Sequence, residues 1–117
     1  MAVIKVAARV TGSTGPSAEL DFLVDSGASY SVLPKQVWKK QGLKPKRRMR
    51  FTLADGMSIE RGISEGHFAL GEVDGISPVI LGEGKDVALL GTVTLETLGL
   101  VLNPFDRTLK PMRMMLA

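Results

Sequence analysis

The sequence lacks the residues on which several common kinds of protein chemistry depend. Its 117 residues include no cysteine, which excludes disulfides and thiolate metal sites. The single histidine, His67, leaves no partner for a histidine metal site and disfavours a Ser-His catalytic pair. No apolar run is long enough to cross a bilayer, and residues 1–10 lack the basic-then-apolar layout of a secretion signal. We therefore expect a soluble cytoplasmic protein with no metal and no cofactor.

The residues that are present are those of an ordinary globular protein. Hydrophobic residues make up 44% of the chain and charged residues 23%. A chain of this length buries one modest core and has no room for two lobes of ordinary size. We expect a single domain over residues 1–117.

Positive charge is concentrated in residues 39–50, KKQGLKPKRRMR, which hold seven Lys and Arg and no acid. The rest of the chain carries eight basic and 12 acidic residues, a net charge of −4 against +3 for the whole. Such a run binds nucleic acid or acidic peptides in some proteins, and in most it is a solvated loop. It lacks the interleaved aromatic residues of a single-strand-binding surface, so nucleic acid is not the expected partner.

Short alternating apolar segments separated by turn residues predict mostly strands. Two segments, 34–42 and 92–99, read as short helices, with Pro34 at the first helical position, Thr92 as an N-cap, and Gly42 and Gly99 as stops. The dipeptides Asp55-Gly56 and Asp74-Gly75 predict two-residue hairpin turns. The sequence thus predicts an all-β, closed barrel-like fold with two short helices, its strands at 3–10, 18–24, 48–62 and 66–81 (both hairpins), 86–91, 100–104 and 107–116.

The segment FLVDSGAS (22–29) drives a buried-looking strand directly into a carboxylate. One interpretation is a strand that simply ends in an Asp-Ser-Gly turn. The other is that Asp25 is held at the strand end to perform chemistry. Ser26 offers a hydroxyl, Gly27 permits a close backbone N–H, and Ala28 keeps the neighbouring wall small.

One aspartate alone is a poor hydrolytic catalyst near neutral pH, because it is already ionised. Two carboxylates about 3 Å apart share a proton, so one can activate water while the other donates to a carbonyl; aspartic proteases are the standard example of this effect. The chain has a single Asp-Ser-Gly. A homodimer would bring two copies of Asp25 together on its two-fold axis.

With these motifs in order, the sequence resembles the retropepsin-like aspartic proteases, in particular the small soluble bacterial and archaeal type. The resemblance covers nearly the whole chain and implies a single retropepsin-type lobe. It implies that Asp25 is catalytic, in a dyad of Asp25 and its copy in a homodimer, with Ser26, Gly27 and Ala28 supporting the loop. The expected activity is that of an aspartic endopeptidase (a hydrolase) on peptide or protein substrates.

The resemblance also assigns two further segments. RFTLADGMSIERG (50–62) falls where the family has its flap hairpin, which implies substrate contacts for Ala54, Asp55, Gly56 and Met57. VALLGTVTLETLGLVLN (87–103) is similar to the second family signature. There Leu89 and Leu90 would pack beneath Asp25, and Gly91 would be a point of close approach.

The chain departs from viral family members at two places that concern the dimer. Thr92 follows Gly91 where those members usually carry arginine, and the chain continues for more than ten residues beyond the strand 100–103. Two other functions stay open at this stage. These are a peptide-binding dimer with weak or no catalysis, and nucleic-acid binding through residues 39–50.

Overall fold

The computed structural model describes residues 3–12, 15–103 and 105–113. Within them no helix is long and apolar enough to span a membrane. In chain order the elements are β1 (Val3–Thr11), β2 (Ser17–Asp25), β3 (Ser31–Leu33), α1 (Lys35–Lys40), β4 (Arg47–Thr52), β5 (Ser58–Leu70), β6 (Val73–Leu81), β7 (Leu89–Leu90), α2 (Thr92–Thr97), β8 (Leu100–Asn103) and β9 (Thr108–Pro111). The expected mostly-β fold with two short helices is confirmed.

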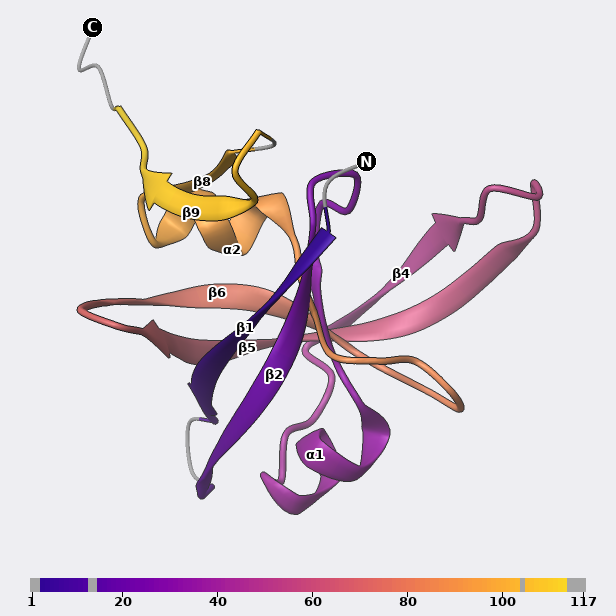
Figure 1. Cartoon of the computed structure of the whole chain (residues 1–117). Helices are drawn as coiled ribbons and strands as arrows, with labels where there is room; N and C mark the ends of the chain where they lie inside the picture. The colour runs from indigo at the N-terminus through magenta and orange to yellow at the C-terminus, as the bar shows by residue number, and fades with distance from the viewer. Residues whose placement is uncertain (1–2, 13–14, 104, 114–117) are drawn as a thin grey trace, which may run out of the picture.

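Seven strands form one sheet in the order β1-β2-β7-β3-β6-β5-β4, and β8 and β9 form a separate hairpin (Figure 1). The end of β1 also pairs with β5, from Arg9 to Thr11, so that six strands make a ring of pairings with β4 outside it. The ring is uneven, because β3 meets β7 through one residue pair only. We describe it as a sheet ring and not as a regular barrel.

The ring encloses an apolar core to which most strands contribute every second residue. Phe22 and Phe68 are fully buried, with ring centroids 6.0 Å apart. Val24 and Leu90 are buried beside them, directly below the end of β2. This alternation is the period-two pattern of a strand with one face in the core, and it gives the loop after β2 a rigid base.

One predicted turn is wrong. The β5–β6 hairpin turns at Gly71 and Glu72, while Asp74 and Gly75 lie within β6. Gly71 has φ +60°, the geometry that a two-residue turn with glycine first requires. Gly75 instead allows close packing, since a Cβ there would lie 3.0 Å from the side chain of Thr97 in α2.

The other predicted turn is in the right place but is one residue longer than expected. The β4–β5 loop contains three residues, Ala54 to Gly56. Two hydrogen bonds close it: the N–H of Gly56 donates to the carbonyl of Leu53 at 2.9 Å, and the N–H of Leu53 donates to the carbonyl of Met57 at 2.7 Å. Gly56 takes the left-handed position of this loop, with φ +88°.

Several boundaries also differ from the expectations. Pro34 and Gly91 are the N-caps of α1 and α2, so Pro34 is not a first helical residue and Thr92 is not a cap. Gly42 and Gly99 end the helices with positive φ, as expected. The three-residue strand β3 was not expected, β7 is much shorter than 86–91, and the final strand ends at Pro111, with residues 114–116 of the expected strand outside the described part.

Candidate active site

Asp25 is the last residue of β2, between β1 and β7. Its side chain is half-buried, and the backbone N–H of Gly27 donates to its Oδ1 at 2.8 Å. The N–H of Ala28 donates to its backbone carbonyl at 3.1 Å. The tight turn expected at Ser26 and Gly27 is therefore present, and it holds the Asp25 carboxylate in one orientation.

The loop after Asp25 is locked to the start of α2. The carbonyls of Ala28 and Ser29 accept the N–H groups of Thr92 and Val93, both at 2.9 Å. The first N–H groups of a helix have no carbonyl acceptor within the helix, and here the loop supplies two such acceptors. Gly91 lies directly against the loop, because a Cβ there would be 2.5 Å from the carbonyl oxygen of Ser29. Gly91 is thus a close-approach point, as the resemblance implied.

Beneath this loop lies a buried network of three hydroxyl groups. Thr94 Oγ1 is hydrogen-bonded to Ser31 Oγ and, at 2.8 Å, to Ser77 Oγ, and all three residues are fully buried. Ser31 Oγ also accepts the N–H of Gly91 at 3.0 Å. The network ties α2 to β3 and β6. Sequence reasoning missed it, although Ser31 and Ser77 stand among the apolar residues of two strands.

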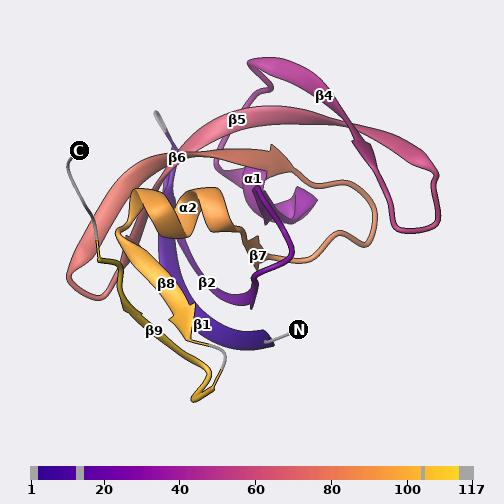
Figure 2. The ribbon, with the colours of Figure 1, turned by 90° about the horizontal axis from the view of Figure 1, so that it is seen from above.

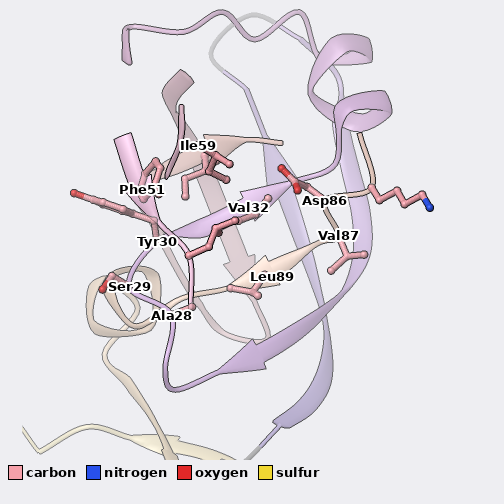
Figure 3. A pocket seen from close by; sticks show the side chains of 12 residues that line it. Ala28, Ser29, Tyr30, Val32, Phe51, Ile59, Asp86, Val87 and Leu89 are labelled. Atoms are coloured by element: carbon pink, nitrogen blue, oxygen red, sulfur yellow. The ribbon is translucent and has the colours of Figure 1, made fainter. Parts of the chain in front are cut away.

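An apolar pocket of about 530 Å³ adjoins the loop (Figure 3). Tyr30 and Phe51 meet edge-to-face on one side of it, with ring centroids 6.2 Å apart. Further apolar lining comes from Val32, Leu53, Ile59, Ile80, Val87 and Leu89. Leu89 was expected to pack beneath Asp25; it pairs with Leu23 of β2 and also faces this pocket. Leu90 pairs with Val24 and is fully buried.

One wall of the pocket carries a carboxylate, Asp86, which Figure 3 shows directed toward the cavity. Its Oδ2 accepts hydrogen bonds from Arg61 Nε and from the N–H of Glu83, both at 2.9 Å. Burial is the largest single influence on the pKa of Asp86 and raises it, but these hydrogen bonds and the Arg61 charge together lower the pKa below its ordinary value of 3.8. The ion pair links the loop 82–88 to β5.

The expected flap residues lie together at the tip of the β4–β5 hairpin. Ala54, Asp55 and Gly56 are exposed, and Asp55 Oδ1 accepts the N–H of Met57 at 3.0 Å. Met57 exposes 64% and Leu53 42% of their surface. Leu53 lines the pocket from the side of the hairpin.

The described residues contain no group of three or more His, Cys, Asp or Glu able to hold a metal ion. His67 Nε2 is hydrogen-bonded to Asp74 Oδ2 at 2.6 Å on the exposed side of β5 and β6. Asp74, the aspartate of the second Asp-Gly pair, therefore interacts with His67 and not with the loop that carries Asp25.

The basic segment 39–50 is not one solvated loop, since it runs from the end of α1 into β4. Lys46 pairs with Glu65 at 2.6 Å and Arg48 with Glu60 at 2.7 Å, so two of its seven charges are balanced across the hairpin. Because of the Arg48 hydrogen bond and charge, the pKa of Glu60 is lowered.

A sequence profile of the family described as aspartyl protease matches residues 6–94. The chain belongs to the aspartyl protease family. The solution structure of the Simian Foamy Virus (mac) protease shares the fold with a TM-score of 0.58, at 17% identity, over 80% of this chain and 92% of the viral one. A search of curated proteins gives no match. The resemblance to retropepsin-like proteases is thereby confirmed at the level of family and fold.

The buried hydroxyl network gives a first prediction. Its central residue, Thr94, is also the last residue that the aspartyl protease family profile matches. Thr94→Val keeps the shape of the side chain but removes the hydroxyl to which both Ser31 and Ser77 are hydrogen-bonded. We expect a loss of about 1–3 kcal/mol in the free energy of unfolding, measured by urea denaturation. Thr97→Val, an exposed threonine in the same helix, is the control and should change stability by less than about 0.5 kcal/mol. Equal effects would contradict a special role for the network.

The second prediction concerns pH. A lowered pKa in the folded state means that ionised Asp86 stabilises the fold above about pH 4 and that this contribution is lost as pH falls through the folded pKa. Asp86→Asn should therefore lower the melting temperature at neutral pH, and the difference from the natural chain should shrink near about pH 2. A difference that is constant with pH would show that the Arg61–Asp86 pair does not stabilise the loop.

Proposed function

We propose that the chain is an aspartic endopeptidase that acts as a homodimer, with Asp25 of each protomer forming the catalytic dyad. The observation that carries the proposal is a half-buried carboxylate, fixed by the Gly27 N–H at the end of a rigid strand, beside an apolar pocket. The chain has one Asp-Ser-Gly, so the second carboxylate has to come from a second copy.

The reaction needs only the two carboxylates and a water molecule. The ionised Asp25 takes a proton from water as the water oxygen bonds to the peptide carbonyl carbon, and the protonated Asp25 of the partner donates its proton to the carbonyl oxygen. The resulting tetrahedral diol breaks its C–N bond as the nitrogen takes up the proton now held by Asp25 and one diol hydroxyl returns a proton to the partner's Asp25, which leaves an amine, a carboxylic acid and a dyad with one proton. The Gly27 N–H holds the carboxylate in the orientation for these transfers.

The substrate we propose is an extended peptide lying between the β4–β5 tip and the loop that carries Asp25. The exposed Leu53 and Met57 at the tip and Val87 on the opposite loop, which is 55% exposed, would cover an apolar side chain of the peptide. The pocket between Tyr30 and Leu89 would accept that side chain. Peptides with a large apolar residue near the cleaved bond should be preferred over those with a charged one.

The proposal predicts that activity follows the dimer. Specific activity on a peptide library should fall on serial dilution in step with dissociation measured by sedimentation, because each half-site lacks the second carboxylate. Asp25→Asn should abolish cleavage, a loss of at least about a thousandfold, without changing the dimer. Full specific activity in a demonstrated monomer would contradict the dyad. A dimer that binds peptides but cleaves none in the natural chain would favour a binding function.

The hairpin tip gives a matched pair of variants. Gly56 and Gly71 both have positive φ, and a Cβ at either meets no atom within 4 Å, so valine should strain both turns similarly, by about 1–2 kcal/mol. Only Gly56→Val should lose turnover, since Gly71 lies in the β5–β6 turn. Steady-state kinetics and thermal melting of the two variants separate the effects. Native kinetics for Gly56→Val on several peptides would show that this hairpin does not cover the substrate.

A further inference from the structure

Phe105 stands almost completely in solvent at the turn between β8 and β9. Its side chain is 96% exposed, whereas the next most exposed large apolar residue of the described chain, Ile76, is 65% exposed. Asn103 Oδ1 accepts the N–H of Phe105 and the Asn103 carbonyl accepts the N–H of Arg107, both at 2.9 Å, so these two residues are tied to the end of β8. The end of the β8–β9 hairpin thus presents a phenyl ring to solvent, an unfavourable arrangement for an isolated protomer.

A small apolar pocket of about 200 Å³ lies on the same part of the molecule. Its lining includes Ser26 beside the catalytic aspartate, Leu95 of α2, Leu100 and Leu102 of β8, and Met112. An apolar cavity of about 150 Å³ is enough to hold a benzene molecule. The pocket is therefore large enough for one phenyl ring.

The position of the pocket indicates what covers it. Figure 1 shows the β8–β9 hairpin, the loop after β2 and the start of β1 together at the top of the molecule, and Figure 2 shows the hairpin beside the start of β1 from above. If two copies of Asp25 meet on a two-fold axis, as the proposed function requires, the neighbouring Ser26 and its pocket face the partner protomer.

The charged residues around the ring and the pocket are complementary. Glu96, at the pocket rim, is exposed, and Arg107 follows Phe105 by two residues. Among the described residues neither forms an ion pair within the protomer. Asp106, the residue before Arg107, accepts a hydrogen bond from Thr108 and forms an ion pair with Lys110. In a two-fold interface the ring region of each protomer faces the pocket region of the other. The acid at the pocket then lies opposite the base beside the ring.

Arg107 also has φ +56°, and it is the only non-glycine residue of the described chain with a positive φ. This conformation costs a side-chain-bearing residue about 1 kcal/mol or more, and glycine is the usual choice for it. An arginine at this position is thus unfavourable for the isolated hairpin.

We propose that Phe105 of each protomer inserts into the pocket between Leu95 and Met112 of its partner, and that Arg107 pairs there with the partner's Glu96. The inference rests on the proposed homodimer and names the contact that assembles it. Each dimer contains the contact twice, so one substitution removes two rings.

The test is the dimer dissociation constant from sedimentation velocity. Phe105→Ala should raise it by about 100-fold or more, because two buried aromatic anchors are lost, while melting of the monomer stays near that of the natural chain. Ile76→Ala is the matched control, an exposed apolar residue that lines a different pocket, with His67. It should leave the constant within about twofold.

Arg107 provides a variant whose two effects have opposite signs. Arg107→Gly should relieve the backbone strain and so keep or raise the melting temperature of the protomer, yet raise the dissociation constant about tenfold. Glu96→Arg and Arg107→Glu should each weaken the dimer, and the two together should restore it. A double variant as weak as the sum of the single ones would overturn the ion pair.

A cross-link identifies the occupant of the pocket directly, because the natural chain has no cysteine. Arg107→Cys combined with Glu96→Cys should give a covalent dimer on mild oxidation, while Ile76→Cys combined with Glu96→Cys should not. An intramolecular link, or no link in a chain that sedimentation shows to be dimeric, would mean that another segment fills the pocket.

The outcomes separate this inference from the proposed function. A dimer with active Asp25 that is indifferent to Phe105→Ala overturns the inference and leaves the dyad intact. A natural chain that is fully active as a monomer overturns the dyad and with it the need for the contact. A dimer that loses affinity on Phe105→Ala but has no peptidase activity supports the contact and contradicts the catalytic proposal.

Discussion

The structure depends most on the junction between the loop that carries Asp25 and the first turn of α2. Two loop carbonyls, those of Ala28 and Ser29, accept the N–H groups of Thr92 and Val93, and Gly91 permits the approach because no side chain stands between. These bonds satisfy the start of a helix that is too short to persist alone. They also immobilise the residues directly after the aspartate, so the same contacts serve folding and the geometry of the site.

The parts that the sequence predicts are those with local chemical signals. Asp25 at a strand end, the hairpin tip at Gly56 and the helix ends at Gly42 and Gly99 follow from strand alternation and from the conformational freedom of glycine. Each of these features can be predicted from only a few neighbouring residues. The family resemblance then supplies their order in the fold and the close approach at Gly91.

The parts that it does not predict depend on distant partners. Ser31, Ser77 and Thr94 are separated by up to 63 positions, and nothing local marks them as one buried network. The turn at Gly71 competes with a stronger dipeptide signal at Asp74-Gly75, and in the fold Gly75 lies within β6 and close against α2. The pairing of β8 with β9 likewise joins segments whose sequences show only that each is a strand.

The central claim is that catalysis needs Asp25 from two protomers, and subunit mixing tests it most directly. The natural chain and Asp25→Asn are mixed in equal amounts, left to exchange, and assayed on a peptide substrate at a fixed total concentration. If every active dimer needs both carboxylates, activity falls to about a quarter of that of the natural chain, because only homodimers of natural protomers cleave. Activity of about one half, the value for protomers that work independently, would contradict the account.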